Sequence, residues 1–311
     1  MQSGKGITDV PGVKVGSAED SEAKTGCTVA IFENGAVAGV DVRGSAPGTR
    51  EIESIKPVRN VEKIHAILLT GGSAFGLDAA GGVQKFLEEK GIGYDVQVAR
   101  IPIVPAAVIF DLRVGSASVR PDFEMGYRAA ADASGENPEI GLHGVGIGAS
   151  AGGISGEKRG RGGFGTASFK INDNVVVGVM TVANPLGNVI DPYRNKTIVG
   201  STNRDDWVLP KSGEPWIENT VLAVVATNCK MTKEQATKVA QMAQDGVSRT
   251  IIPAHTMYDG DIVFAVSTGN EECDINVIGD AAAEAVAKSI IIGVSAANGL
   301  ELDSINRETI G

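Results

Sequence analysis

The sequence has few of the residues that mark disulfide frameworks, metal sites or membrane spans. Its three cysteines, Cys27, Cys229 and Cys273, are odd in number and lack metal-ligand spacing, so we expect buried, reduced thiols and no metal site. The longest apolar runs are far too short to span a bilayer, and the N-terminus lacks the apolar core of a signal peptide. These absences predict a cytoplasmic protein without a membrane segment.

Positive charge and aromatic residues are also scarce. Lysines and arginines number 28 against 38 aspartates and glutamates, for a formal net charge of −10, and no basic cluster is present to follow a phosphate backbone. A nucleic-acid partner is therefore not expected. Aromatic residues make up 5%, whereas 41 glycines indicate tight turns and closely packed backbone. With 42% hydrophobic residues, residues 1–311 are predicted to form a single domain.

The first half of the chain alternates short apolar runs with glycines, a pattern typical of strands joined by tight turns. Residues 27–32 and 36–42 flank Glu33-Asn34-Gly35, which is the clearest hairpin signal. Further expected elements are a buried strand at 64–70, helices at 74–90 and 123–133, and an irregular extended stretch at 99–112, which contains two prolines.

The second half has clearer patterns. A hairpin of residues 168–171 and 175–182 should deliver Asn184 to a strand end. Expected elements beyond it are a strand at 220–227, a helix after the capping box at 232–235, a strand at 261–266 and a helix at 280–294. Because strands cluster and helices flank them, we predict an α/β fold of two sheets covered by helices, an αββα sandwich.

The bond between Asn219 and Thr220 stands where an expected exposed loop, Lys211–Trp216, gives way to a buried strand. If that bond were cut, Thr220 would carry both a hydroxyl nucleophile and a free α-amine able to accept the hydroxyl proton. This is the arrangement of N-terminal threonine nucleophiles. An ordinary threonine at a strand edge is the simpler interpretation, and partner groups elsewhere in the chain have to decide between the two.

Asp259 and Asp261 are candidate partners of this threonine. They flank Gly260 just before an apolar run, and a tight turn would let both carboxylates reach one neighbouring group. A solvated Asp-Gly turn is the alternative. If the strand that follows pairs with the strand of Thr220, either carboxylate can hold the α-amine and hydroxyl of that residue.

Asn184, before Pro185 at a strand end, is a candidate oxyanion donor, because a fixed side-chain amide supplies N–H dipoles without changing its charge. An isolated asparagine there is equally consistent with a turn. His143 and His255 lack the partner pattern of a serine–histidine or metal site, and we expect them to be structural. The glycine motif at 160–165 precedes a β-hairpin rather than a helix, which argues against a dinucleotide site.

Six segments of the chain form a distinctive combination: residues 7–16, 70–80, 104–112, 161–168, 219–227 and 259–265. Together they resemble the DmpA-like family of self-processing aminopeptidases and nylon-oligomer endohydrolases (the DmpA/NylC family). The segments follow the order of the family nearly from end to end. The resemblance implies an αββα sandwich, a homotetramer of processed units and no cofactor.

The resemblance also implies a precursor that cuts itself before a serine or threonine. In this sequence, self-cleavage at Asn219-Thr220 would give an α chain of residues 1–219 and a β chain of residues 220–311. Thr220 would then be the nucleophile. The remaining site residues implied by the family are the oxyanion donor Asn184 and the acidic pair Asp259 and Asp261.

The same resemblance narrows the choice of substrate. An Asn-Thr bond at Asn219-Thr220, with two aspartates, is closer to the nylon hydrolases than to the aminopeptidases, which tend to have Gly-Ser and a Ser/Glu pair. Arg161 stands where the family often has lysine and is a candidate for substrate binding. Tyr127 is a nearby candidate for the active-site tyrosine of the family.

These features predict a self-processing amide hydrolase that works through a Thr220 acyl-enzyme. Its expected small-molecule substrates are 6-aminohexanoate oligomers or short peptides with a free amine. One alternative is an aminopeptidase or β-aminopeptidase of the same family. Another is an acyltransferase of the ornithine acetyltransferase type, which passes the acyl group to an amine instead of water. A non-catalytic oligomeric binding protein is the remaining alternative and predicts no self-cleavage.

Overall fold

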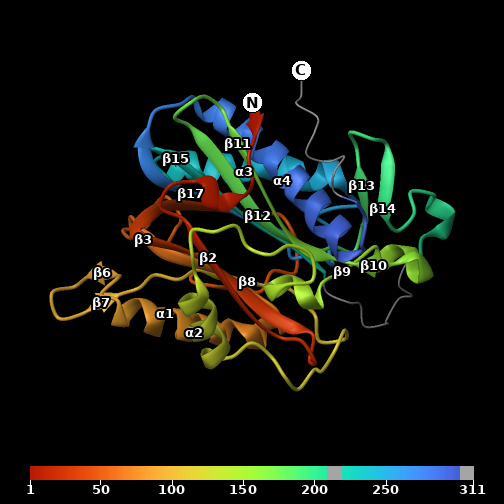
Figure 1. Cartoon of the computed structure of the whole chain (residues 1–311), viewed down its shortest axis with the longest axis horizontal. Helices are drawn as coiled ribbons and strands as arrows, with labels where there is room; N and C mark the ends of the chain where they lie inside the picture. The colour runs from red at the N-terminus through yellow and green to blue at the C-terminus, as the bar shows by residue number, and fades with distance from the viewer. Residues whose placement is uncertain (209–218, 302–311) are drawn as a thin grey trace.

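The strands of the large sheet follow the order β1-β11-β12-β15-β17-β3-β5-β8-β4, with β2 also paired to β3 (Figure 1). The structure is a computed structural model that describes residues 1–208 and 219–301. The strands of this sheet are β1 (Gln2–Ser3), β2 (Lys14–Asp20), β3 (Thr25–Val42), β4 (Thr49–Arg50), β5 (Ile64–Thr70), β8 (Ala106–Val108), β11 (Gly163–Lys170), β12 (Val176–Asn184), β15 (Thr220–Cys229) and β17 (Ile262–Glu271).

Shorter elements and helices surround this sheet. The short strands are β6 (Tyr94–Asp95), β7 (Arg100–Ile101), β9 (Ser150–Ala151), β10 (Gly160–Arg161), β13 (Asn188–Asp191), β14 (Lys196–Val199) and β16 (Ile251–Ile252). The α-helices are α1 (Ala79–Glu89), α2 (Phe123–Asp132), α3 (Lys233–Thr250) and α4 (Ile275–Ala297). Short 3-10 turns lie at Ile7–Asp9, Ser73–Asp78, Gly144–Gly148, Gly153–Lys158 and Arg204–Asp206.

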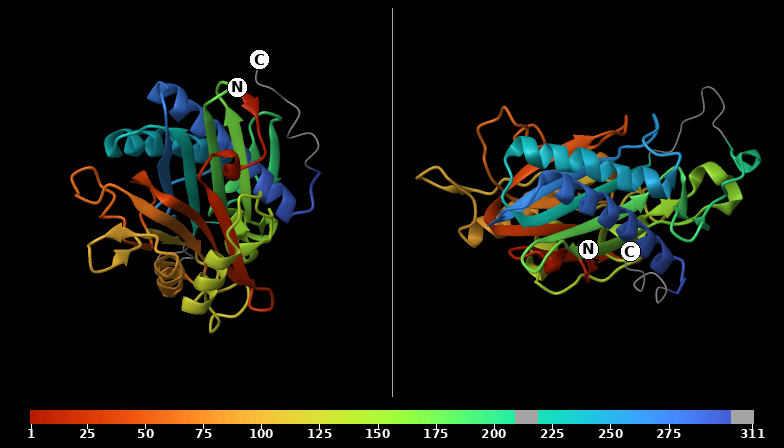
Figure 2. Two further views of the ribbon diagram at one scale, coloured as in Figure 1. Left: turned by 60° about the vertical axis from the view of Figure 1, so that its left-hand side comes forward. Right: turned by 90° about the horizontal axis from the view of Figure 1, so that it is seen from above.

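Three apolar clusters separate four layers. Strand β3 pairs with both β17 and β5, so that one half of the sheet contains β15 and the other half contains β5. In β15, Val224 faces a cluster between these two halves, whereas its neighbour Val225 faces a cluster under α3 and α4. In β5, Leu69 faces the same central cluster and Leu68 packs toward α1 and α2. Successive side chains of a strand point to opposite faces, so both halves of the sheet are buried on both sides. Helices α3 and α4 lie side by side on one outer face (Figure 2), and the predicted αββα sandwich is confirmed.

Glu33-Asn34-Gly35 does not form the predicted hairpin. Instead, β3 continues through it as one strand, and its pairing with β5 changes register between Ile31 and Ala36. Residues 37–42 then pair with β17 and not with residues 27–32. Gly35 has a positive φ of 70°, a backbone conformation that is common in hairpin turns. Here this conformation forms an irregularity within β3, the strand that both halves of the sheet share.

The helices and strands predicted from residue 64 onward are confirmed with shifted ends. Helix α1 begins later than expected, because Ser73–Asp78 forms a 3-10 turn. The capping box that starts α3 is present: the Thr232 hydroxyl accepts from the N–H of Gln235 at 3.2 Å, and the Gln235 side chain accepts from the N–H of Thr232 at 2.9 Å. Helix α4 begins earlier than expected, after Asp274, whose carboxylate caps it.

Cys27 and Cys229 are buried free thiols, and Cys273 is partly buried. Across residues 1–208 and 219–301, no helix combines the length and apolarity needed to cross a bilayer. The predicted exposed loop Lys211–Trp216 lies outside the described residues.

Glycines allow α4 to lie directly on the sheet. A Cβ atom on Gly165 of β11 would overlap the carbonyl oxygen of Ser289 in α4 and approach Gly293. By contrast, a Cβ atom on Gly135 would meet nothing within 4 Å. The close contact between helix and strand therefore depends on glycine at 165 but not at 135.

We expect Gly165→Ala to destabilise the protein by about 1–3 kcal/mol, because the added methyl group has to push α4 away from β11. The matched control, Gly135→Ala, should stay within about 0.5 kcal/mol of the parent chain. Denaturant-induced unfolding followed by circular dichroism measures both values. Equal stabilities of the two variants would contradict this account of the packing.

Candidate active site

The Asn219-Thr220 bond lies at the start of β15, between two neighbouring strands. On one side β12 runs antiparallel and pairs Asn184 with Thr220. On the other side β17 pairs with β15 and runs parallel to it, and a bridge just before β17 pairs Asn219 with Asp259. Partners directly opposite each other in an antiparallel pair project to the same face, so the side chains of Asn184 and Thr220 are neighbours. Each of these four residues is at most 4% exposed.

The carbonyl group of Asn219 receives two hydrogen bonds. The backbone N–H of Gly260 donates to its oxygen at 2.7 Å, and the Thr220 hydroxyl donates to the same oxygen. A Cβ atom on Gly260 would lie 2.9 Å from Thr220 Oγ1 and 2.7 Å from the carbonyl oxygen of Ala46. Only glycine therefore lets this N–H approach so closely, and the carbonyl is polarised toward attack by the adjacent hydroxyl.

Asp261 fixes the peptide that follows Thr220. Its Oδ1 accepts from the N–H of Val221 at 2.7 Å, while Oδ2 accepts from the N–H of His255 at 3.0 Å and lies 2.8 Å from His255 Nδ1. This carboxylate connects the strand of the candidate nucleophile to the loop before β17. It therefore sets the position of the backbone immediately after Thr220.

Asp259 is held on the other side of Gly260. Its Oδ1 accepts from the N–H of Leu186 at 3.3 Å, and its Oδ2 accepts from the N–H of Thr256 at 3.0 Å and from the hydroxyl of the same threonine. Burial and the neighbouring charge of Asp261 raise the pKa of Asp259 from 3.8 to about 6. Among the described residues, no hydrogen bond joins either carboxylate to the Thr220 hydroxyl in the uncut chain.

The Asn184 side chain is fixed at both ends. Its Oδ1 accepts from the N–H of Ser150 at 2.9 Å and from the Ser150 hydroxyl at 3.2 Å, and its Nδ2 donates to the carbonyl oxygen of Phe110 at 3.2 Å. These contacts orient the amide so that its oxygen faces donors. The amide nitrogen has a second N–H, which can serve a developing oxyanion.

Arg161 lies next to Ser150, which holds the Asn184 side chain. It is in β10, directly opposite Ser150 in β9, and its Nη2 donates to the carbonyl oxygen of Ile147. Ser150 therefore connects Arg161 to Asn184. The structure thus brings the residues predicted for the site into one region, with Arg161 at its margin. These residues are Asn184, Asn219, Thr220, Asp259 and Asp261.

Tyr127 is not part of this region, and its assignment as a candidate active-site tyrosine was wrong. It lies on α2, where its hydroxyl donates to Glu89 at 2.8 Å and its ring packs edge-on against Phe86. His143, as expected, serves a structural role beside Glu19 and Glu139. The wrong assignment arose because closeness in sequence to a family motif does not specify which layer of the sandwich a helix joins.

Sequence analysis missed three groups that line the site. These are the Gly260 N–H, the Ser150 and Phe110 pair that holds Asn184, and His255, whose ring contacts Asp261. The position of Gly260 between both candidate carboxylates was a usable signal. No comparable signal marked Phe110 or Ser150, because their contacts to Asn184 arise only in the folded chain.

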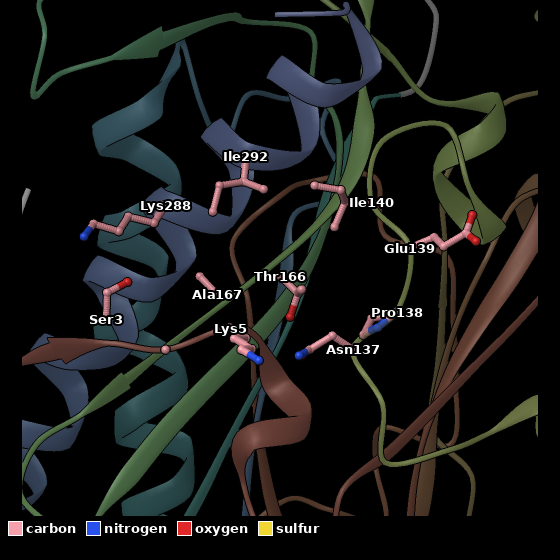
Figure 3. Close-up of a pocket in the computed structure, with 11 residues that line it drawn as sticks. Ser3, Lys5, Asn137, Pro138, Glu139, Ile140, Thr166, Ala167, Lys288 and Ile292 are labelled. Atoms are coloured by element: carbon pink, nitrogen blue, oxygen red, sulfur yellow. The ribbon is translucent and has the colours of Figure 1, made fainter. Parts of the chain in front are cut away.

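A cavity of about 650 Å³ lies away from these residues (Figure 3). Lys5 and Asn137 point toward each other across it, and Thr166 of β11 and Ile292 of α4 contribute further walls. None of the residues predicted for the active site lines this cavity. It therefore contributes nothing to the candidate chemistry.

The αββα sandwich places the chain in the N-terminal-nucleophile hydrolase class of fold, as the following solved structures show. The solved L-aminopeptidase D-Ala-esterase/amidase of Ochrobactrum anthropi, described as a variant of that fold, matches with a TM-score of 0.72 at 17% identity, over 94% of this chain and 86% of its own. A β-aminopeptidase of Burkholderia sp. matches with a TM-score of 0.69 at 22% identity, over 93% and 86%. These likenesses establish the fold.

The chain belongs to peptidase family S58, whose model matches residues 5–306. A Mycobacterium tuberculosis protein named as an uncharacterized aminopeptidase is 38% identical over 93% of both chains. The 6-aminohexanoate-oligomer endohydrolase of Paenarthrobacter ureafaciens is 33% identical over 86% of this chain and 75% of its own. The predicted resemblance is confirmed, and the comparisons support amide-bond hydrolysis as the activity.

The raised pKa of Asp259 predicts a specific dependence of stability on pH. Because folded Asp259 holds its proton more tightly than the unfolded chain does, its ionisation lowers stability as the pH rises from about 4 to about 6. Asp259→Asn removes this ionisation. The stability of that variant relative to its parent should therefore increase across this pH range.

Thermal unfolding at several pH values, in a Thr220→Ala chain with the Asn219-Thr220 bond intact, measures this difference. Asp173→Asn, on the exposed turn between β11 and β12, is the control for loss of one surface carboxylate. A difference between Asp259→Asn and its parent that is the same at pH 4 and pH 7 would show that Asp259 does not ionise in this range.

Proposed function

We propose that the protein is a self-processing N-terminal-nucleophile amide hydrolase, with Thr220 first attacking its own chain and then the substrate. The observation that carries this proposal is the pair of hydrogen bonds at the Asn219 carbonyl, from the Thr220 hydroxyl and from the Gly260 N–H at 2.7 Å. A nucleophile and an oxyanion donor thus meet at one peptide bond, which is the requirement for acyl transfer.

The first reaction converts the peptide bond into an ester. Thr220 Oγ1 adds to the carbonyl carbon of Asn219, and the Gly260 N–H stabilises the negative charge that develops on the oxygen. The carbon–nitrogen bond then breaks, and the hydroxyl proton ends on the departing nitrogen of Thr220. Water hydrolyses the ester, which leaves a carboxylate on Asn219 and a free α-amine on Thr220.

The second reaction uses the new N-terminus on a substrate amide. The α-amine of Thr220 takes the hydroxyl proton as Oγ1 attacks the substrate carbonyl, and Asn184 donates its free N–H to the oxyanion. The leaving amine receives the proton, and water releases the acyl group. Asp259 and Asp261 hold the α-amine between them, because two carboxylates beside an ammonium group favour a fixed position for it.

Short oligoamides are the proposed substrates, with 6-aminohexanoate oligomers first among them. The 33% identity to a 6-aminohexanoate-oligomer endohydrolase and the Asn-Thr bond at Asn219-Thr220 support this choice. The 38% identity to a protein named as an aminopeptidase supports short peptides as the second candidate. A comparison of kcat/KM for a 6-aminohexanoate trimer and for a tripeptide decides between the two. We further propose a cytoplasmic homotetramer of processed units.

Intact mass spectrometry of the purified protein tests self-cleavage. We expect two species that correspond to residues 1–219 and 220–311, because the Thr220 hydroxyl is positioned to break the bond between them. Thr220→Ala should remain whole, and Thr220→Ser, which keeps a hydroxyl, should still separate into the two species. A Thr220→Ala chain that splits at the same bond would rule out this nucleophile.

Replacement of Asn184 by alanine tests the oxyanion donor. We expect kcat to fall by about 10²–10³ with little change in KM, because the side chain acts on the charge that develops in the transition state. Steady-state kinetics on fully processed enzyme measures both constants. Asn60→Ala, at an exposed position, is the control. A kcat within a few-fold of the parent value would remove Asn184 from the catalytic machinery.

A further inference from the structure

A cavity of about 440 Å³ opens beside Asn184 and carries a cluster of positive charge. Its lining includes Arg113, Arg159 and Arg161, together with Phe110 and Ser150. The formal net charge of the chain is −10, so the charge of this cluster is opposite in sign to that of the whole protein. The local excess of guanidinium groups therefore indicates an anionic ligand.

Two residues that line the cavity, Phe110 and Ser150, also hold the side chain of Asn184, the proposed oxyanion donor. The carbonyl oxygen of Phe110 accepts from Asn184 Nδ2, and Ser150 donates twice to Asn184 Oδ1. A substrate whose scissile carbonyl is bound by Asn184 would therefore lie next to two residues that line this cavity. The cationic cluster thus neighbours the residues that hold the proposed oxyanion donor.

Arg161 is built into the structure and is not a mobile surface side chain. Its backbone N–H donates to the Asn298 side chain at 3.2 Å, and its carbonyl oxygen accepts from the same side chain at 2.9 Å. Its Nη2 donates to the carbonyl oxygen of Ile147. Burial lowers the pKa of Arg161. Arginine side chains carry a positive charge in proteins at neutral pH.

These positive charges are not neutralised within the part of the chain that the structure describes. No carboxylate of residues 1–208 or 219–301 lies within 4.0 Å of the guanidinium nitrogens of Arg113, Arg159 or Arg161 in an ion pair. In the same residues, the buried Nε of Arg161 has no hydrogen-bond acceptor. Most of the donor capacity of the cluster is thus available for a ligand.

We infer that this cavity binds a free carboxylate of the substrate, so that the enzyme prefers short oligoamides or peptides that end in a carboxylate near the scissile bond. Guanidinium groups bind carboxylates through paired, charge-assisted hydrogen bonds. Asp259 and Asp261 lie on the opposite side of Thr220, beside β17, where they serve the α-amine. This inference rests on the proposed function and adds the class of substrate to it.

Binding of two matched probes tests the inference without any need for turnover. 6-Aminohexanoate and 6-amino-1-hexanol differ only in the carboxylate, and neither contains an amide bond. Calorimetric titration of the processed protein should show that the acid binds at least about ten-fold more tightly, the size expected for a hydrogen bond to a charged group. The double variant Arg113→Gln/Arg159→Gln should lose most of this preference.

The variants are chosen to leave the fold intact. Arg113 and Arg159 are exposed, so their replacement leaves the buried contacts of Arg161 in place. Arg100→Gln, on β7 at the opposite end of the molecule from β10 (Figure 1), removes a single positive charge from an exposed pair with Asp95 and should keep the preference.

Equal binding of the acid and the alcohol to the parent protein would overturn the inference, as would a preference that survives in the double variant. Self-cleavage is monitored on the same preparations by intact mass. A chain that stays whole contradicts the proposed function, whereas a chain that splits normally but binds both probes equally contradicts only the carboxylate cavity. The two failures are therefore distinguishable.

Discussion

The parallel pairing of β15 with β17 is the constraint on which the whole site depends. It brings the turn at Asp259-Gly260-Asp261 against Asn219-Thr220, so that the Gly260 N–H meets the Asn219 carbonyl. The segment after β3 holds the turn from its other side, where the N–H groups of Gly44 and Ala46 donate to Asp261 and Asp259 carbonyl oxygens at 3.2 and 3.0 Å. Main-chain hydrogen bonds thus position the bond proposed to be cut.

This positioning places two carboxylates close together in a buried site. Each accepts hydrogen bonds from several N–H groups, which offsets part of the cost of burial, yet the pKa of Asp259 is still raised to about 6. A free α-amine on Thr220 would place a positive charge beside both carboxylates. Self-cleavage at Asn219-Thr220 would therefore relieve the repulsion that the uncut chain contains.

Sequence patterns predicted the parts of the site that depend on strand identity and strand ends. The buried run at 220–227 and the hairpin that ends at Asn184 are local signals, and the structure confirms both. The prediction of a hairpin at Glu33-Asn34-Gly35 was wrong, because the same residues also suit an irregular strand. Only the pairing of the following residues with β17, which is distant in sequence, decides between a hairpin and a continuous strand. The arginine cavity was equally hidden, since Arg113 and Arg159 meet only through tertiary contacts.

The most direct test of the central claim is a search for the acyl-enzyme on Thr220. The processed protein is quenched with acid during turnover of a 6-aminohexanoate oligomer. The fragments are then analysed by mass spectrometry and peptide mapping. The account predicts that the fragment beginning at Thr220 gains the mass of the acyl group, bound as an ester to the Thr220 hydroxyl. An acyl group found on any other residue would contradict it.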